Sequence, residues 1–508
     1  MSSPDVYSHT DLLGTEHMGP KGWIRQFYCF ELPENYDVYV EHFPPHFPPW
    51  AATNSRPQRR GDVPSQEGLL GHEGPLPPAG YKMVPVMDGS AQPGRFEWRR
   101  FPEDEVEDFK VKDMREDFMT FADFKAKEYP MAPLAPEKFC PRGLWVDEND
   151  LELWFHTTWM QANFVKGGLI LCMGIFHASA DQTAAYIMTR VFAEEMTKAQ
   201  GLPVADPVDI AVLLKDREKL HKSQRAHIAQ AAVAQQGICE EHPEYIILPF
   251  TPDAPPPKLL APISQSHIFH FSPQALEQLK KDCQPTPEQL QTLKGDKDLP
   301  AFVSTNDALN ALLWKVIMEV QHPDLDAAIK EDPERPSHMI IALDERRRAG
   351  LHKHTLGNLL AWAPVFCDLK SVVRDSSMAD LAVLCRRSVA QRTDDPDVVH
   401  KLEAMLEGVE NLDRLAPQVF LDMPGRNMIT SNWRDNSYYG LDFGAAVGGK
   451  MKAMRAPSVG VCHGFHIVLP DRPDKPGIEV IVSVENSAIG ALLKHPVWTK
   501  YAEQPKLL

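Results

Sequence analysis

The sequence predicts a protein of mixed α-helix and β-strand that folds in two halves. Apolar runs of strand length alternate with amphipathic stretches of helix length, which is typical of α/β and α+β proteins. A proline-rich segment at 252–262 separates two such series and is the best linker candidate. The 508 residues are enough for two or three domains. We therefore expect an N-terminal domain over 1–215, a crossover and linker over 216–263, and a C-terminal domain over 264–508.

The elements expected before the linker follow from aromatic content, prolines and hydrophobic periodicity. Prolines punctuate one long stretch, which must be loop or extended chain because proline cannot donate the helical hydrogen bond. Gly201 ends the most regular helical pattern of this half. In order, we expect a strand at 22–32, the proline-rich stretch at 44–93, a partly helical stretch at 103–128, strands at 151–157 and 163–176, and helices at 183–200 and 213–236.

The elements expected after the linker again alternate. Ser272 and Ser304 (or Thr305) precede helical patterns and are suitable N-caps. In order, we expect a strand at 267–271, helices that begin after Ser272 and after Ser304, a strand at 338–343, a helix at 377–392, strands at 427–430, 459–469 and 478–484, and a closing helix at 488–502.

Composition excludes several classes of protein. A net charge of -17 argues against nucleic acid as a main partner, since phosphate binding needs a basic face, and solubility is its simpler explanation. The eight cysteines form no Cys-x-x-Cys pair, so we expect neither a metal site nor a disulfide scaffold, and mostly buried free thiols. No apolar run reaches ~18 residues. We therefore expect no contact with a membrane and a cytoplasmic location.

A histidine at the end of an apolar strand is the first candidate for chemistry. The run 169–176 ends on His177, and Asp181 follows four residues later. Imidazole accepts a proton near neutral pH, so His177 is either a general base or a satisfied core histidine. The spacing leaves open whether Asp181 orients the ring or fixes the turn. His322 and Asp326 share this spacing in a polar, proline-broken stretch, where we expect a surface turn.

Three further motifs have simple alternatives. The run 344–348 is either a solvated charge cluster or the source of an arginine that turns inward to pair with Asp181. The run 442–444 could be a loop with a glycine hinge, because the other kinase motifs are missing. The glycines before Lys450 and Lys452 form either a phosphate cradle or a flexible basic loop.

In their order along the chain, these motifs resemble the BAHD-type, CoA-dependent acyltransferases, in particular the fungal branch that includes trichothecene acetyltransferases. The matching stretches are 161–181 with His177 and Asp181, 267–276, 304–315, 344–348 with 356–358, 430–433 and 441–444. Some positions depart from the family pattern. Phe176 replaces a histidine, Gln182 replaces a glycine, Asn432 is inserted before Trp433, and Ala445 and Ala446 replace tryptophan and glycine.

The resemblance implies a fold of two chloramphenicol-acetyltransferase-like domains, each a mixed sheet with helices, and an active-site channel between them. It implies transfer of an acyl group, acetyl or another short chain, from acyl-CoA to a hydroxyl or amine of a specialised metabolite. His177 would be the base of a direct ternary-complex mechanism, with no bound cofactor and a monomeric enzyme. The other implied roles are oxyanion donors at Thr430 and Trp433, a structural pair of Asp181 with Arg346 (or Arg348), support by Asp442, and CoA binding by Ser304, Lys450 and Lys452.

Two rival interpretations remain open from sequence. The first is a condensation-type or ring-forming enzyme that takes its acyl group from a carrier protein. The second is a non-catalytic binding protein of the same fold, which the departures at Phe176, Gln182, Ala445 and Ala446 motivate.

Overall fold

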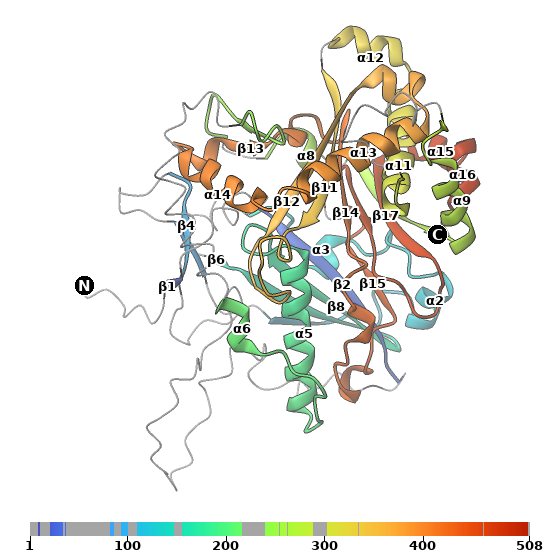
Figure 1. Ribbon diagram of the computed structural model, residues 1–508. Coiled ribbons are helices and arrows are strands. Elements are labelled where there is room, and N and C mark those ends of the chain that lie inside the picture. The colour runs from blue at the N-terminus through green and yellow to red at the C-terminus, as the bar shows by residue number, and fades with distance from the viewer. Residues whose placement is uncertain are drawn as a thin grey trace, which may run out of the picture.

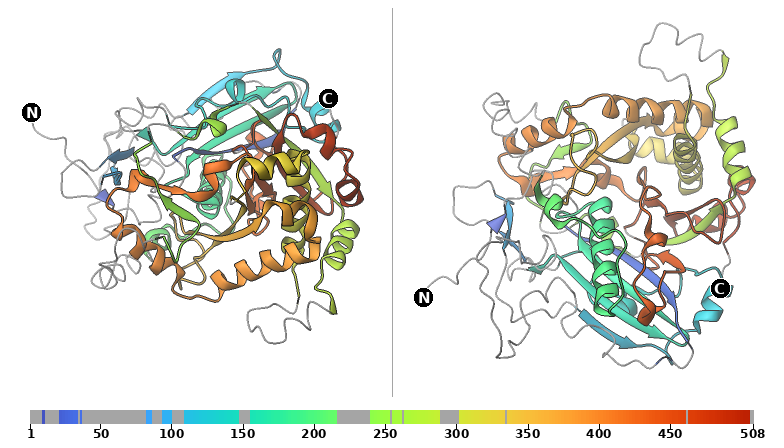
Figure 2. Two further views of the ribbon diagram at one scale, coloured as in Figure 1. Left: turned by 90° about the horizontal axis from the view of Figure 1, so that it is seen from above. Right: turned by 60° about the horizontal axis from the view of Figure 1, so that its bottom comes forward.

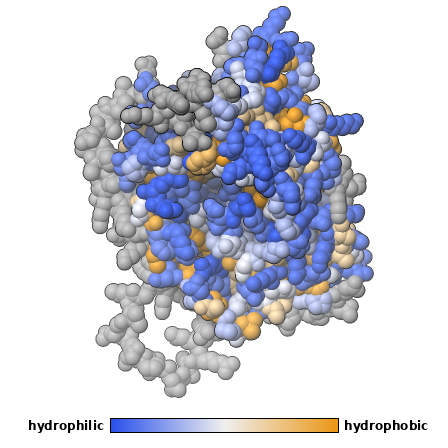
Figure 3. Space-filling model, turned by 45° about the vertical axis from the view of Figure 1, so that its right-hand side comes forward, coloured by the Kyte–Doolittle hydropathy of each residue, from blue (hydrophilic) through white to orange (hydrophobic). Residues whose placement is uncertain are grey.

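The computed structural model describes most of the chain. The described residues are 9–10, 21–33, 36, 82–85, 93–99, 109–146, 155–215, 239–252, 255–261, 263–287, 302–333, 335–460 and 462–505. Most of the proline-rich stretch 44–93 and most of the expected helix 213–236 lie outside them. None of the helices within these ranges combines the length and the hydropathy that crossing a bilayer needs. The face in Figure 3 is mainly hydrophilic, in keeping with the high content of charged residues.

Two mixed sheets form the two halves (Figure 1). The first has the order β15-β2-β8-β7-β5, with β15 (Ala453–Arg455), β2 (Trp23–Glu31), β8 (Gly168–Phe176), β7 (Thr158–Val165) and β5 (Phe109–Asp113). The second has the order β10-β17-β16-β14-β11-β12, with β10 (Ser264–Phe271), β17 (Ile478–Glu485), β16 (Phe465–Val468), β14 (Asn427–Asn432), β11 (Pro336–Asp344) and β12 (Leu360–Asp368). Because β15 pairs with β2, a late segment of the chain completes the first sheet.

Helices cover both sheets and leave apolar faces to meet between them. One core lies between the second sheet and α11 (Thr305–Gln321) and α13 (Met378–Thr393). Another contains α5 (Gln182–Ala199), the inner faces of both sheets and α14 (Val398–Gly408), so it joins the two halves. Figure 2 shows α5 lying along the first sheet while α11 and α13 lie on the second.

The remaining elements are short. The helices are α2 (Phe121–Ala126), α3 (Pro136–Phe139), α6 (Ile210–Lys215), α8 (Pro257–Leu260), α9 (Pro273–Asp282), α12 (Leu325–Glu331), α15 (Ile489–Leu492) and α16 (Pro496–Tyr501). A small sheet has the order β1-β4-β3-β6, with β1 (His9–Thr10), β4 (Phe96–Arg99), β3 (Lys82–Pro85) and β6 (Phe155–His156), and a second pairs β13 (Leu415–Pro417) with β9 (Tyr245–Ile247).

The helix starts predicted from capping residues are confirmed. Ser272 caps α9, and its hydroxyl accepts a hydrogen bond from the backbone of Ala275. Ser304 caps α11 in a reciprocal pair with Asp307, which is a capping box. The apolar core face of α11 then follows from its helical spacing.

Several predicted elements are wrong in detail. The expected strand at 163–176 is a hairpin of β7 and β8, whose turn contains Gly167 at φ +79°, a backbone conformation that favours glycine. The expected helix at 488–502 is broken into α15 and α16, because Pro496 can begin a helix but not continue one. The expected strand at 459–469 shrinks to β16, and the stretch 103–128 contains strand β5 as well as helix α2.

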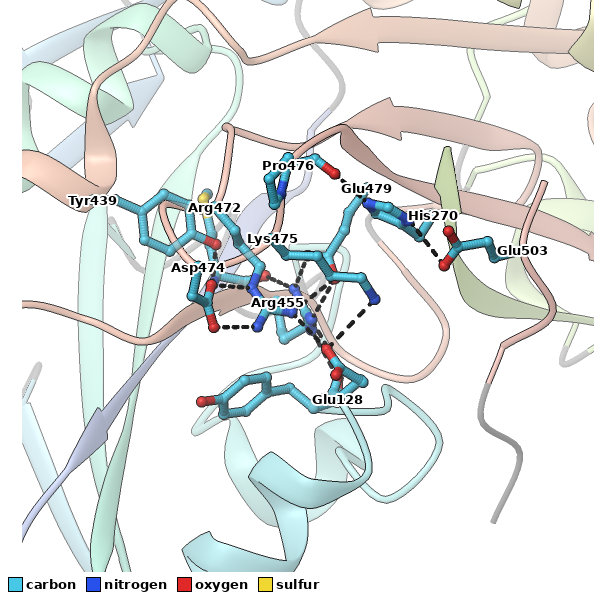
Figure 4. Close-up of polar contacts among 12 residues, drawn as sticks. Glu128, His270, Tyr439, Arg455, Arg472, Asp474, Lys475, Pro476, Glu479 and Glu503 are labelled. Carbon is cyan, nitrogen blue, oxygen red and sulfur yellow. Dashed lines mark hydrogen bonds and ion pairs between the residues drawn. The ribbon is translucent and has the colours of Figure 1, made fainter. Parts of the chain in front are cut away.

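A buried ion network ties the two halves together (Figure 4). Arg455 of β15 forms an ion pair with Glu479 of β17 at 2.9 Å, and both side chains are at most 4% exposed. Arg455 also donates to the backbone oxygens of Glu128 and Tyr129, which both adopt positive φ. Arg472 adds a second ion pair to Glu479 at 3.0 Å. The network therefore joins the turn after α2, the first sheet and the second sheet.

Candidate active site

His177 sits where the two halves meet. It is the first residue after β8, and its backbone N–H donates to the carbonyl of Gly22 at 2.8 Å. Its own carbonyl accepts from the side-chain amide of Asn358 at 3.2 Å. Gly22 lies just before β2 of the first sheet, and Asn358 lies just before β12 of the second. The backbone of His177 is therefore held from both sides.

Asp181 has no contact left for the imidazole. One of its oxygens accepts from the backbone of Ala184, which makes Asp181 the N-cap of α5. The other accepts from the backbone of Leu359 at 2.8 Å. Arg346 then binds both oxygens, at 2.7 and 2.9 Å, with both side chains almost fully buried. The inward-turned arginine is therefore Arg346, and both oxygens of Asp181 are bound by it and by backbone groups.

Arg348, the alternative partner, points elsewhere. Its guanidinium donates to the backbone oxygen of Asp344 and pairs with Glu345 at 3.0 Å. Arg346 in turn donates its remaining hydrogens to the carbonyls of Thr355 and Gly357 and to the carboxylate of Asp344. A buried ion pair whose other donors and acceptors are satisfied is the arrangement that holds a fixed geometry.

The surroundings of His177 favour the neutral form of its imidazole. Burial lowers its pKa below the ordinary value, while its own backbone and the charge of Asp181 raise the pKa by less. Nδ1 is buried and forms no well-aligned hydrogen bond with another described residue. A neutral imidazole can accept a proton, and this is the state a general base needs at neutral pH.

The two departures beside the motif have structural explanations. Phe176 is 1% exposed and packs edge-on against Trp23 in the outer core of the first sheet, with ring centroids 5.6 Å apart. Its side chain therefore points away from His177. Gln182 accepts from Gln26 and donates to Tyr438, each at 2.7 Å. The turn forms without a glycine, since Gln182 is simply the first residue of α5.

The oxyanion candidates lie on opposite faces of β14. Thr430 pairs with Ile341 and His466, and Ile341 belongs to the core under α11. Ser431 points the other way because side chains alternate along a strand. Its hydroxyl accepts from the indole N–H of Trp433 at 3.0 Å, and Trp433 belongs to the core between the halves. The hydroxyl on the same face as Trp433 is thus that of Ser431. The sequence did not indicate Ser431, because Asn432 looks like an insertion in the motif.

Trp433 and His177 share one edge of the second sheet. The strands β11 and β14 run parallel, so Asp344 at the end of β11 and Trp433 just after β14 lie at the same edge. Leu360 of β12 pairs with Asp344, and Asn358, two residues earlier, binds the backbone of His177. His177 and Trp433 therefore both lie toward this edge of the second sheet.

A basic cleft of about 990 Å³ opens beside this edge. It lies between α5, the loop after β11 and the loop after Trp433. Its cationic side chains include Arg190, Arg347, Arg348 and Lys353, of which Arg347 and Lys353 form no ion pair with a described residue. The other lining residues include Thr183, Tyr186, Ile187, Leu351, Asp435, Asn436 and Ser437. The sequence showed the arginine cluster but not that it faces a cleft.

The predicted CoA-binding residues separate into two groups. Ser304 caps α11, and the next turn lies beside β14, since Asn432 donates to Asn306 at 3.1 Å. Lys450 and Lys452 lie instead on the loop that leads into β15. The backbone of Lys450 pairs with that of Asp442 in an isolated antiparallel β-bridge.

Asp442 is also far from His177. Its carbonyl accepts from Thr197 at 2.9 Å, near the C-terminal end of α5, and its carboxylate accepts from the backbone of Gly444. Asp181 marks the other end of α5, roughly 24 Å away at 1.5 Å per residue. The structure therefore does not bring Asp442, or the nearby Lys450, to His177.

Within the described residues, no group of three or more metal-ligating side chains is present.

Comparison with known proteins supplies the wider context. The family model "Transferase family" matches residues 159–496, and the "Trichothecene 3-O-acetyltransferase-like N-terminal domain" matches 85–195. Trichothecene 3-O-acetyltransferase TRI101 of Fusarium sporotrichioides is 25% identical over 424 residues, which cover 79% of this chain and 81% of that protein. Eremophilane O-acetyltransferase prx11 of Penicillium rubens is 24% identical and covers 68% and 71%.

A longer relative matches as well. Enoyl-CoA isomerase/hydratase claC of Penicillium crustosum is 26% identical over 434 residues, and the chain spans 45% of its length.

Solved structures share the fold. F. graminearum TRI101 complexed with coenzyme A and deoxynivalenol superposes with a TM-score of 0.73 at 18% identity, covering 98% of this chain and 99% of that one. Vinorine synthase superposes at 0.56 with 13% identity, covering 100% and 97%. The predicted two-domain fold is confirmed by these matches.

Fold and family match together define the class of protein as a transferase built on two mixed sheets. Because one family model covers about two thirds of the residues, the chain belongs to the transferase family. The resemblance to fungal acyltransferases that the motifs indicate is confirmed.

Proposed function

We propose that this protein transfers an acyl group from acyl-CoA to a hydroxyl or amine of a specialised metabolite, with His177 as the general base. The observation that carries the proposal is the placement of a neutral imidazole between the two halves, on the same sheet edge as Trp433 and beside a basic cleft. The names of the matched relatives, mostly O-acetyltransferases, favour acetyl as the acyl group and a hydroxyl as the acceptor.

In the proposed step, Nε2 of His177 takes the proton of the acceptor as its oxygen attacks the thioester carbonyl. The tetrahedral intermediate then expels the CoA thiolate, which recovers the proton from His177. No covalent acyl-enzyme is needed, because donor and acceptor are held together. Asp181 contributes by fixing the turn that carries His177, through Arg346.

The negative oxygen of the intermediate needs hydrogen-bond donors. We propose that the indole N–H of Trp433 supplies one, by turning from its present acceptor, the hydroxyl of Ser431, to the substrate oxygen. The hydroxyl of Ser431, which only accepts in its bond with Trp433, can donate its own hydrogen as a second donor. Thr430, the donor expected from sequence, lies on the helix-covered face and is assigned no contact with the oxyanion.

The phosphates of CoA fit the basic cleft. Arg347 and Lys353 form no ion pair with a described carboxylate, and phosphate is a preferred partner of arginine. The N-terminus of α11 at Ser304 is the second candidate for phosphate, since its dipole favours anions. Lys450 is a weaker candidate for binding phosphate because it lies far from His177. Lys452 lies on the same loop and is a weaker candidate for the same reason.

Replacement of His177 by alanine tests the base. General-base catalysis contributes roughly 10²–10⁴-fold, so H177A should lose about that much of kcat in an acyl-transfer assay read by mass spectrometry. H322A is the matched control, because His322 has the same spacing to an aspartate but ends α11 on the way to α12. An H177A variant that binds CoA and keeps full activity would refute the mechanism.

A condensation-type reaction is the second candidate, because the first condensation domain of the CDA synthetase superposes with a TM-score of 0.51 over 97% of this chain. Calorimetry separates the two. Tight binding of free CoA that weakens in the double variant of Arg347→Glu and Lys353→Glu supports the first function. No binding of free CoA supports a carrier-bound donor. Transfer to any acceptor would remove the hypothesis of a non-catalytic binding protein.

The domain limits at 215 and 263, a monomeric state and a cytoplasmic location remain predictions. Limited proteolysis, light scattering and a fluorescent fusion would test them respectively.

A further inference from the structure

A pair of buried thiols lies on the outer face of the first sheet, away from the proposed catalytic site. Cys140 follows α3, and Cys172 lies in the middle of β8. Their sulfur atoms are 3.6 Å apart, and the side chains are 7% and 0% exposed. Both are free thiols. They lie within one apolar core, which aromatic side chains of β2, β7 and α3 also form.

A buried arginine shares this core. Arg25 of β2 is 1% exposed and lies two residues before Phe27, which is the strand partner of Cys172. Its Nε and Nη2 form no hydrogen bond with a described residue. No carboxylate among the described residues forms an ion pair with it. A buried, unpaired guanidinium costs several kcal/mol, so an anion beside it would be strongly stabilised.

The two thiols of this core are groups that can become anions. The charge of Arg25 acts to lower the pKa of both Cys140 and Cys172. Burial alone would raise the pKa of Cys140, but the hydrogen bond from Cys172 and the charge of Arg25 lower it below the ordinary value. Burial raises the pKa of Cys172 well above the ordinary value. The hydrogen bond with Cys140 and the negative charge of Cys140 raise it further. A negative charge in this pair is therefore favoured on Cys140 over Cys172.

We propose that Cys140 and Cys172 form an oxidant-sensitive dithiol, in which the Cys140 thiolate is the counter-ion of Arg25 and reacts with peroxide. A thiolate beside a second thiol is the arrangement of redox-active cysteines. The thiolate attacks one peroxide oxygen, the O–O bond breaks, and water leaves after a proton is taken up. Cys140 becomes a sulfenic acid.

Cys172 completes the reaction. Its sulfur attacks the sulfur of Cys140, the S–O bond breaks, and hydroxide leaves with the proton of Cys172 as a second water molecule. In total, one thiolate, one thiol, one peroxide and one proton give a disulfide and two water molecules. The disulfide removes the counter-ion of Arg25, which favours the reduced form. The bond is therefore easily reduced again, as for other disulfides whose reduced thiolate is stabilised.

The chain contains its own controls for this inference. Cys239 and Cys367 are more exposed than the pair, but burial raises the pKa of Cys239 to about 11 and also raises that of Cys367. If exposure decided reactivity, these two would react first. If the fraction of each cysteine present as thiolate decides reactivity, Cys140 reacts first although it is buried.

The experiment treats the folded, full-length chain with dilute hydrogen peroxide, blocks the remaining thiols and maps peptides by mass spectrometry. The expected product is a peptide linked through Cys140 and Cys172 while Cys239 and Cys367 remain reduced. In C172S, dimedone should trap Cys140 as its sulfenic acid. Oxidation of Cys239 or Cys367 first, or a bond from Cys140 to another cysteine, would overturn the proposal.

Two variants test the role of Arg25. R25M removes the charge from an apolar core and should slow oxidation of Cys140 by about tenfold or more, because the thiolate fraction falls. R25K keeps a cation and should restore part of the rate. Circular dichroism checks that each variant folds. If R25M does not fold, the result with R25K and C172S decides, and an unchanged rate in folded R25M would refute the assigned counter-ion.

Discussion

At the scale of single residues, the site depends on which way a few side chains point. His177 is held at its backbone while its ring is free of the usual carboxylate partner, since Asp181 is bound by Arg346 and two backbone groups. The same distinction applies on β14, where alternation places Ser431 and Thr430 on different faces. These orientations lead to two predictions.

The first prediction concerns pH. Burial lowers the pKa of His177, so the neutral base persists to lower pH than for an exposed histidine. The acid limb of kcat/KM should therefore be centred below the ordinary value of about 6.5. The measurement uses an acceptor without an ionisable group, so that the limb belongs to the enzyme. A limb centred above 6.5 would contradict the assigned environment.

The second prediction separates the hydroxyls. W433F removes the proposed oxyanion donor and should lower kcat by roughly 10²–10³-fold, the effect typical of one such donor. S431A should lower kcat less, since it removes a secondary donor and the partner of the indole. T430V should leave kcat close to that of the wild type, because Thr430 faces the core under α11. A larger loss in T430V than in S431A would reverse the assignment.

At the scale of elements, the sequence predicts best where local chemistry decides. Caps and periodicity place the starts of α5, α9, α11 and α13 to within about one residue. Each start is fixed locally, because the side chain of the N-cap residue accepts a hydrogen bond from the backbone N–H three residues later. The expected strand at 163–176 fails since an apolar run does not show where it folds back, and only Gly167 marks the turn.

For the site, the sequence locates the His177 motif and the arginine cluster, and family resemblance supplies their pairing. It does not show which arginine turns inward, because this depends on carbonyls at Thr355 and Gly357 that only the folded loop brings near. Nor does it show the pair of Cys140 with Cys172, which are 32 residues apart in the chain.

The third prediction concerns Asp181, which caps α5 and pairs with Arg346. D181N keeps a good capping residue but removes the charge, so it should cost about 3–5 kcal/mol, because the buried Arg346 loses its buried, bidentate carboxylate partner. D181A also loses the cap and should cost ~1 kcal/mol more. Thermal midpoints should therefore fall in the order wild type, D181N, D181A.

D344N is the matched control for this series. Asp344 also contacts Arg346, at 3.2 Å, but its side chain is 43% exposed, and water screens an exposed charge. Its loss should shift the thermal midpoint much less than D181N. An equal shift in the two variants would mean that the buried pair is not what holds the turn.

At the scale of the whole molecule, the two halves are joined covalently by the chain and physically by β15. This strand comes from the second half of the sequence and pairs with β2 of the first sheet. The network of Arg455, Arg472 and Glu479 lies where β15 meets β17 (Figure 4). Because His177 is bound by residues from both sides, the rigidity of this junction bears directly on the proposed site.

The last prediction tests that junction. Burial alone would raise the pKa of Glu479, but Arg455 and Arg472 lower it below the ordinary value. A carboxylate with a lowered pKa stabilises the folded state above its unfolded pKa, and this contribution is lost as pH falls through the folded pKa. E479Q should thus lower the thermal midpoint at pH 7 by far more than D471N, which breaks the exposed pair of Asp471 with Arg434. The difference between E479Q and the wild type should be constant above about pH 5 and shrink only below the ordinary glutamate pKa of about 4.3. A difference that already shrinks between pH 7 and pH 5 would show that the carboxylate is not held charged by the two arginines.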